Sequence, residues 1–253
     1  MRGIFKADRC KAHVIQISGA TMVSQDEIKA KSFGNASEAQ YGDISSESEL
    51  GQIIRKHQNR TVDNYILDIA DQSPNVKTAL VIPSLIYGKG RGPGNQRSIQ
   101  VPELARIALE RKRAVHIGAG ANIWSNVHVS DLSSMLVRLV ESAISGSDDK
   151  QIWGSSGFFF AGAHPGISFN AVAKSIADSA QKSGLLSDNQ IDQISAAEAD
   201  ALSPHASAIV GTNARTLSER AQKVLGWSAK GPTLEDQIPP TVSIEAERLR
   251  SVL

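Results

Sequence analysis

The chain has 253 residues, which suits one domain or one domain with a small lobe. It carries 27 Lys and Arg residues against 26 Asp and Glu residues. Because no basic stripe stands out, neither nucleic acid nor an anionic membrane surface is a predicted partner. The only cysteine, Cys10, excludes an intramolecular disulfide, and no metal site is expected because no metal-binding motif occurs. The sequence has neither a signal-peptide core nor an apolar run of the ~20 residues that span a bilayer, so a cytoplasmic protein is predicted.

The first half of the chain alternates between strand and helix patterns. Runs of β-branched residues predict strands at residues 13–17, 78–82 and 114–117. Apolar residues at helical spacing predict helices at residues 50–70, 101–111 and 131–142, the last with Ser130 as its N-cap. Polar or Gly- and Pro-rich surface segments are predicted at residues 20–48 and 83–98. This order implies right-handed crossovers and a mainly parallel sheet.

After residue 146 the predicted elements are shorter and more helical. A strand is predicted at residues 157–161, where three phenylalanines follow one another. Helices are predicted at residues 168–183, 191–201 and 217–225, the first capped by Ser168 and the last closed by Gly226. A short helical tail follows. These elements suggest a small lobe placed over the edge of the sheet.

Four segments, in this order, carry a resemblance to a known superfamily. They are HVIQISGAT at residues 13–21, LVIPSLIYG at 80–88, NVHVSDL at 126–132 and RAQKVLGW at 220–227. The chain resembles the extended short-chain dehydrogenases/reductases, the NAD(P)-dependent epimerase/dehydratase group, and within it an atypical branch. The resemblance implies an α/β fold with an incomplete Rossmann-like parallel sheet and a small, mostly helical C-terminal lobe. Residues 1–145 would be the C-terminal half of the NAD(P)-binding domain, and residues 146–253 a substrate-side lobe interleaved with it.

The resemblance also implies roles for residues that follow the first two strands. Ser18 and Thr21 would be the catalytic hydroxyl groups that hydrogen-bond the reacting oxygen of the substrate. The alternative for Ser18 is a turn-forming role only. A segment of five residues would lie beside the nicotinamide ring of NAD or NADP: Pro83, Ser84, Leu85, Ile86 and Tyr87. The alternative for this segment is an ordinary strand-ending loop with core hydrophobes.

Two further segments would face a small-molecule substrate, a nucleotide sugar or another polar molecule. Asn95, Arg97 and Ser98 follow the glycine-rich run, where Arg97 could pair with a substrate anion or stay a solvated loop residue. Trp124 and His128 belong to the third matching segment. The resemblance favours a structural role for His128, which with Asp131 would hold the loop through hydrogen bonds.

Two motifs of the family are missing from this sequence. In the family, a Tyr-x-x-x-Lys pair supplies the general acid/base and the ribose contact. The corresponding residues 53–60 contain no tyrosine, although Lys56, His57 or Arg60 could take over the ribose contact. No Gly-x-Gly-x-x-Gly register fits the glycines at residues 88–94 or 118–120, which therefore predict turns rather than a phosphate loop.

The missing glycine motif suggests that the chain lacks the beginning of the family's domain. Residues 13–17 resemble the fifth strand of the family's sheet, so four strand–helix steps, on the order of 90 residues, would precede it in a complete member. Three function hypotheses follow: a truncated NAD(P)-binding oxidoreductase or epimerase, a non-catalytic NAD(P)-binding sensor or regulatory protein, and a remnant that binds no cofactor. A homodimer is also predicted as possible.

Overall fold

The computed structural model describes residues 12–251. The helices are α1 (Gln25–Ala30), α2 (Glu47–Lys56), α3 (Thr61–Gln72), α4 (Gln100–Arg111), α5 (Val129–Ile144), α6 (Phe169–Lys182), α7 (Ala196–Leu202), α8 (Ala206–Val210), α9 (Glu219–Leu225), α10 (Leu234–Arg250) and the 3-10 turn η2 (Ala20–Met22). The strands are β1 (Ala12–Ile17), β2 (Tyr41–Gly42), β3 (Val76–Pro83), β4 (Leu85–Tyr87), β5 (Ala114–Ile117), β6 (Asn126–His128), β7 (Phe158–Ala161), β8 (Ile191–Ile194) and β9 (Thr216–Leu217).

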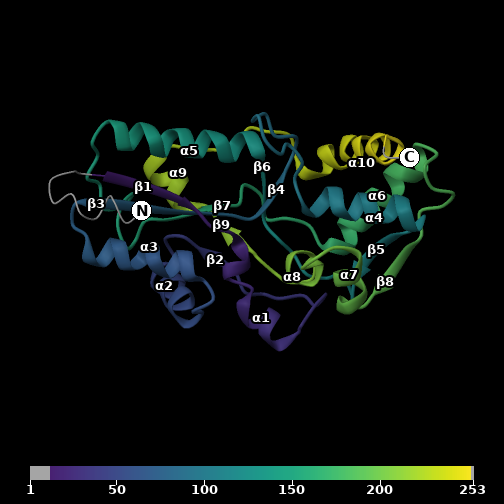
Figure 1. Cartoon of the computed structure of the whole chain (residues 1–253), viewed down its shortest axis with the longest axis horizontal. Coiled ribbons are helices and arrows are strands. Elements are labelled where there is room, and N and C mark those ends of the chain that lie inside the picture. Colours follow the sequence, from purple (N-terminus) through teal and green to yellow (C-terminus); the bar gives the residue numbers. More distant parts are fainter. Residues whose placement is uncertain (1–11, 252–253) are drawn as a thin grey trace.

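Parallel strands form the centre of the fold. The largest sheet has the order β1-β3-β7, and three parallel pairs accompany it: β2-β9, β4-β6 and β5-β8. The predicted α/β class with a mainly parallel sheet is therefore confirmed. Helices α5 and α9 lie on one side of the three-stranded sheet and α2 and α3 on the other (Figure 1). Within residues 12–251, β3 is the only strand that pairs with β1, and no helix there combines the length and apolar character needed to cross a bilayer.

The middle strand of the three-stranded sheet, β3, is buried on both faces. Its successive side chains point to opposite sides of the sheet and join two different apolar clusters. Leu80 and Ile82 of β3 join the apolar cluster that includes Ile66 of α3. Ala79 and Val81 join the cluster that contains Met135 and Leu139 of α5. Strands covered on both faces have continuous apolar sequences, which explains why this run was recognisable as a strand.

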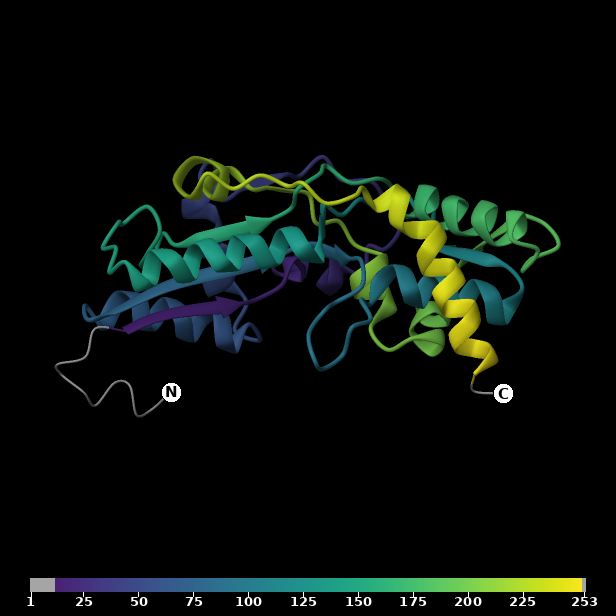
Figure 2. The ribbon, with the colours of Figure 1, turned by 90° about the horizontal axis from the view of Figure 1, so that it is seen from above.

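The other part of the molecule is a helical layer around the pair β5-β8. Helices α4 and α6 pack against β5 and against each other, and α10 lies across both (Figure 2). Strand β7, which follows residue 146, returns to the first sheet beside β3. The two predicted units therefore share a sheet, and their boundary at residue 145 stays a prediction.

The helix predicted at residues 50–70 is wrong, because the structure has two helices there. Helix α2 ends at Lys56 and α3 begins at Thr61. The side-chain amide of the buried Asn64 donates hydrogen bonds to the carbonyls of Ile54, His57 and Arg60. The same three carbonyls also accept backbone N–H groups, from His57, Arg60 and Asn64 respectively, so the backbone stays hydrogen-bonded through the break.

Three boundaries in the rest of the chain also differ from the predictions. Residues 191–194 form β8 beside β5 instead of the start of a helix, and a capping box of Ser195 and Glu198 begins α7. Helix α5 begins at Val129, and its N-cap is His128 rather than Ser130. The tail is a 17-residue helix, α10, with Thr233 as its N-cap and Pro239 and Pro240 inside it. The surface segment at residues 20–48 contains η2, α1 and β2.

A buried carboxylate joins three distant parts of the chain. Asp43, which follows β2, is fully buried and accepts hydrogen bonds from the backbone N–H groups of Phe160 and Arg220. Burial raises the pKa of Asp43 to about 7, although these hydrogen bonds act in the opposite direction. Asp43 thereby holds β7 and the first turn of α9 against β2.

The raised pKa predicts a pH-dependent stability. Between about pH 4 and about pH 7 the folded protein keeps a proton on Asp43 that the unfolded chain has lost. Asp43 therefore contributes stability below about pH 4, and we expect the free energy of unfolding to fall by on the order of 3 kcal/mol as the pH rises to about 7. Denaturant unfolding across this range measures the slope. In Asp43→Asn this part of the slope should vanish; an unchanged slope would assign it to other groups.

Candidate active site

A cavity of about 380 Å³ lies where the carboxyl ends of β1 and β3 meet the loop at residues 88–98. This strand-end cavity collects nine of the twelve residues that the sequence marked as site residues: Ser18, Thr21, Pro83, Ser84, Ile86, Asn95, Arg97, Ser98 and Trp124. Ligands of open parallel sheets bind at this end of the strands. The catalytic and binding roles of these residues stay predictions, whereas their proximity is a property of the fold.

The guanidinium group of Arg60 connects the two predicted catalytic hydroxyl groups. It donates one hydrogen bond of 2.7 Å to Oγ of Ser18 and another of 3.2 Å to Oγ1 of Thr21. A third, from Nε, reaches the carboxylate of Asp63 at 2.8 Å, and a fourth reaches the carbonyl of Gly19 at 3.3 Å. Arg60 lies in the break between α2 and α3, so this break is what turns its side chain toward β1.

Ser18 also borders a second hollow on the outer side of β1. This edge hollow has a volume of about 300 Å³ and is lined by residues 16–18 and 59–63. Arg60 therefore lies between the strand-end cavity and the edge of the sheet. Lys56 and His57, the other two residues with a predicted ribose contact, instead approach the carboxylate of Asp26 in α1.

The segment predicted to line a nicotinamide ring divides between the cavity and the core. Pro83, Ser84 and Ile86 line the strand-end cavity. Leu85 and Tyr87 point the other way because they alternate with Ile86 along β4, and both are buried. The hydroxyl group of Tyr87 donates a hydrogen bond to the carbonyl of Pro232, and burial raises its pKa, so Tyr87 stays protonated at neutral pH.

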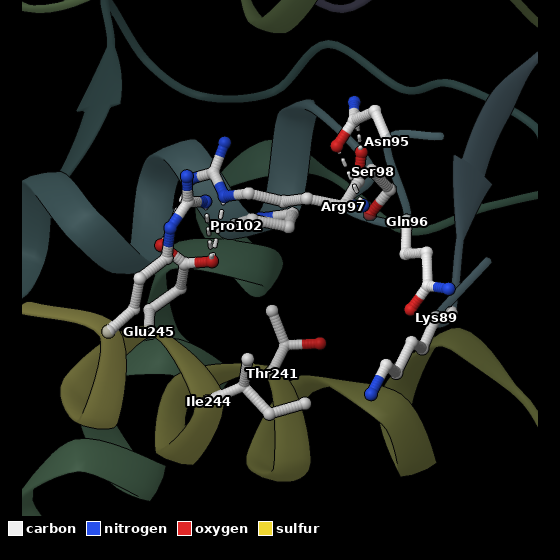
Figure 3. Close-up of a pocket in the computed structure, with 11 residues that line it drawn as sticks. Lys89, Asn95, Gln96, Arg97, Ser98, Pro102, Thr241, Ile244 and Glu245 are labelled. Atoms are coloured by element: carbon white, nitrogen blue, oxygen red, sulfur yellow. Dashed lines mark hydrogen bonds and ion pairs between the residues drawn. The ribbon is translucent and has the colours of Figure 1, made fainter. Parts of the chain in front are cut away.

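Arg97 lines the cavity but is already paired with two carboxylates. Its Nε and one terminal nitrogen bind both oxygens of Glu245 at 2.7 and 3.0 Å, and its other terminal nitrogen binds Glu103 at 2.6 Å. The Glu245 side chain is only 3% exposed. Asn95 turns to the backbone of its own loop, where it bonds the amide and the carbonyl of Arg97. Arg97 thus uses three of its five guanidinium N–H donors in hydrogen bonds to Glu245 and Glu103, and Figure 3 shows the pair with Glu245.

Trp124 and His128, both predicted to face the substrate, differ in their positions relative to the cavity. Trp124 is buried at the cavity wall and its indole N–H donates to the carbonyl of Thr212. His128 lies outside the cavity lining: its Nδ1 bonds Ser130 and caps α5, and its ring packs edge-on against Tyr87. A side chain at Gly88, whose φ is +87°, would collide with this ring.

Ionisable groups are scarce around the cavity. Among its lining residues within the described chain, Arg97 alone carries an ionisable side chain, since Arg60 reaches the cavity only through Ser18 and Thr21. An arginine keeps its proton at every physiological pH, so neither arginine can act as a general base. The site can therefore orient and polarise an oxygen atom through charged and hydroxyl hydrogen-bond donors. The sequence predicted the two hydroxyl groups but not the ion pair of Arg60 with Asp63. The only sequence signal for this pair is that the two residues lie three positions apart at the start of a helix.

Comparisons with known proteins identify the family to which the chain is similar. Residues 56–152 match the model of the NAD dependent epimerase/dehydratase family. "Oxidase ucsJ" from Acremonium sp is 31% identical over 243 residues, which cover 94% of this chain and 70% of the oxidase.

Solved structures of this architecture are similar in fold. MoeE5 in complex with UDP-glucuronic acid and NAD has a TM-score of 0.56 and 16% identity, and the match covers 94% of this chain and 66% of MoeE5. The dTDP-glucose 4,6-dehydratase of Bacillus anthracis str. Ames, in complex with NAD, has a TM-score of 0.58 and 14% identity, with 93% and 62% covered. The chain thus spans just under two thirds of these solved chains. Because the oxidase is 31% identical and the match covers 70% of it, and because residues 56–152 match the family model, the chain belongs to the NAD dependent epimerase/dehydratase family.

Proposed function

We propose that this protein is an NAD(P)-linked oxidoreductase that acts on a small molecule whose reacting oxygen lies against Ser18 and Thr21 in the strand-end cavity. The observation that carries the proposal is the Arg60 guanidinium, which donates to both hydroxyl oxygens. When the oxygen of a hydroxyl group accepts a hydrogen bond, its own O–H becomes a stronger hydrogen-bond donor. Ser18 and Thr21 can therefore offer polarised O–H groups to a substrate carbonyl.

These polarised hydroxyl groups suit a reaction in which negative charge develops on an oxygen atom. A bound nicotinamide dinucleotide would supply or accept the hydride. As a carbonyl carbon gains a hydride, its oxygen becomes alkoxide-like, and preorganised donors stabilise that charge more than they stabilise the neutral carbonyl. Arg60 contributes through its fixed positive charge, which Asp63 holds in place. The proton that completes the alcohol passes from a hydroxyl group or from solvent.

The described residues fit the nicotinamide end of such a cofactor. Pro83 and Ile86 give the cavity an apolar wall, and Ile17, 49% exposed at the end of β1, extends it toward the edge hollow. A flat, weakly polar ring suits such a wall, and Arg60 and Asn59 in the edge hollow offer donors for a ribose. Support for a dinucleotide also comes from the NAD-bound state of the two solved neighbours. The cytoplasmic location and the homodimer stay predictions.

One observation favours a second candidate, a non-catalytic NAD(P)-binding sensor. No tyrosine, histidine, lysine or carboxylate lies among the described residues that line the strand-end cavity. A sensor would need the apolar wall and the ribose donors but no proton donor. The two candidates differ in turnover, not in cofactor binding.

Titration with NAD, NADP and their reduced forms, followed by a turnover assay over a broad carbonyl panel, separates the candidates. We expect cofactor binding together with turnover that falls about tenfold in Ser18→Ala, which is the loss of one hydrogen bond to a developing charge. Ser187→Ala, at an exposed position distant in sequence from the site, is the matched control. Tight binding without turnover would support the sensor, and absence of binding would rule out both candidates.

A further inference from the structure

A further cavity shares η2 with the strand-end cavity. This α1–α2 pocket has a volume of about 400 Å³ and is lined by residues of η2, α1 and α2, by the segment at residues 37–41, and by Asn213 and Arg215 just before β9. Figure 1 shows α1 and α2 close together near β2. Thr21 of η2 lines the strand-end cavity, whereas the next residue, Met22, lines the α1–α2 pocket. The turn η2 is therefore a wall between the two cavities.

Hydrogen bonds of Gln25 connect the pocket to the candidate active site. The Gln25 side chain lines the pocket, donates to the carbonyl of Thr21 at 2.9 Å and accepts from the side-chain amide of Asn59 at 2.9 Å. Asn59 directly precedes Arg60, which binds the Thr21 hydroxyl group. The last residue of α2 also lines the pocket, where the break that carries Arg60 begins. A molecule in the pocket therefore contacts the segments that position Thr21 and Arg60.

Three polar side chains of the pocket have no partner within residues 12–251. They are the hydroxyl group of Tyr41, the carboxylate of Glu49 and the side-chain amide of Gln52. Tyr41 is half-buried, and the other two are exposed. Burial raises the pKa of Tyr41, and the nearby carboxylate of Glu49 acts in the same direction. The Tyr41 hydroxyl group therefore stays protonated next to a carboxylate that no described cation binds.

The other two carboxylates of the pocket are already bound. Glu27 accepts hydrogen bonds from the backbone N–H and the side-chain amide of Asn213. Asp26 pairs with Lys56 at 2.6 Å. Glu49 is therefore the carboxylate that is open to an ammonium group of a ligand, and the neighbouring tyrosine oxygen is a second acceptor.

Arg215 supplies the opposite charge. One of its terminal nitrogens donates to the carbonyl of Ser37 at 2.9 Å and lies 3.5 Å from the carboxylate of Glu38, whose side chain is 99% exposed. Its Nε and its other terminal nitrogen form no hydrogen bond with the described residues, so three N–H donors remain. A ligand carboxylate can accept from these donors.

The lining distinguishes between classes of ligand. A simple anion would face three carboxylates, and a simple cation would face two basic side chains. A zwitterion, which carries one group of each charge, can pair with Glu49 and Arg215 at the same time. Met22, Val23 and Ile53 offer an apolar surface for the carbon skeleton between and beside the two groups.

We propose that the α1–α2 pocket binds an amino acid and that this ligand raises turnover at the strand-end cavity. The ammonium group pairs with Glu49 and Tyr41, and the carboxylate pairs with Arg215. The effect on turnover rests on the proposed function: a ligand that joins α2 to the segment before β9 holds the end of α2, and with it Arg60, in the arrangement that binds Thr21. A ligand that binds this arrangement more tightly than others shifts the population toward it.

Binding can be measured on the complete chain without any cofactor. Isothermal titration with each of the standard L-amino acids, at constant pH and ionic strength, should find at least one that binds. Its N-acetyl derivative and its carboxamide, each of which lacks one of the two charges, should bind about tenfold more weakly or worse. Tyr41→Phe and Glu49→Gln should each lower the affinity by about three- to tenfold. Both variants should fold normally, because neither group has a described partner to lose.

Glu247→Gln, at an exposed position of α10 outside the pocket, is the matched control and should bind the amino acid as the wild type does. Three results would each overturn the proposal. They are a lack of binding by every standard amino acid, a derivative that binds as tightly as the amino acid itself, and wild-type affinity in both Tyr41→Phe and Glu49→Gln.

The effect on turnover has its own readout. A saturating concentration of the bound amino acid should raise kcat by about fivefold or more, as is typical of coupled sites. Gln25→Met should still bind the amino acid but lose this activation, because the hydrogen bonds to Thr21 and Asn59 are gone. An unchanged or lower kcat in the wild type would refute the activating role. If the protein turns over no carbonyl compound, the titrations still decide about the pocket, and a pocket that binds no amino acid leaves the oxidoreductase activity open to its own assay.

Discussion

Replacing Arg97 with alanine is expected to lower the free energy of unfolding by about 3–5 kcal/mol, which is typical of a buried ion pair that loses one partner. The Glu245 carboxylate is 3% exposed and accepts two hydrogen bonds from Arg97. Without Arg97 this buried charge would keep only the weaker approach of Arg248 at 4.0 Å. Denaturant unfolding followed by circular dichroism measures the loss.

Two variants test this explanation. In Arg97→Ala/Glu245→Leu both charges are gone, so most of the lost stability should return. Arg55→Ala removes an arginine that pairs with Asp68 at the surface, where both side chains are at least 40% exposed, and should cost less than about 1 kcal/mol. If Arg97→Ala costs no more than Arg55→Ala, the pair with Glu245 contributes little and α10 is held by apolar packing alone.

Replacing Arg60 with methionine is expected to reduce turnover by about 10–100-fold while cofactor affinity changes less, because its loss weakens both hydroxyl donors, Ser18 and Thr21, at about tenfold each. Arg60 is a positioning residue: it bonds Ser18 and Thr21, which would touch the substrate. The expected signature is a fall in kcat with a nearly constant KM. Steady-state kinetics with the best substrate from the carbonyl panel measures both constants.

The control for Arg60 must separate chemistry from folding. Its loss also leaves Asp63, 3% exposed, without its ion pair. Arg60→Met/Asp63→Leu removes both charges and should recover stability but not turnover. Adding free guanidinium ion at low, non-denaturing concentration to Arg60→Ala should restore part of the activity. Turnover that returns together with stability in the double variant would show that Arg60 only supports the fold.

Several elements could be predicted because their signal is local. A β-branched run that ends at Pro83 predicts β3. Ser168 predicts the start of α6, where its side chain accepts a hydrogen bond from the backbone N–H of Ala171. The helix predicted at residues 191–201 is wrong in its first residues, because the capping box of Ser195 and Glu198 starts the helix after β8. The tail forms a longer helix than the sequence predicts. Pro239 and Pro240 disfavour a long helix, but packing of α10 against α4 and α6 stabilises it.

The candidate site shows the same division between local and distant signals. The position of Ser18 after a strand is enough to place it at the ligand-binding end of a sheet. The contact of Arg60 with Ser18 bridges 42 residues and depends on the helix break at residues 57–60. The partner of Arg97 lies 148 residues away on α10. Charge pairs at such separations have no local pattern, so they become visible only in three dimensions.

The parallel pairing of every described strand has a consequence for how the protein is made. β1 and β3 can pair once residue 83 has left the ribosome, but β7 must wait for residue 161 and β2 for its partner β9 at residues 216–217. Chains with such distant pairings fold slowly, and a nascent chain exposes unpaired strand edges meanwhile. Slower translation or added chaperones should therefore raise the soluble yield. Cutting the chain before residue 216 should leave β2 without its partner strand and Asp43 without its hydrogen bond from Arg220.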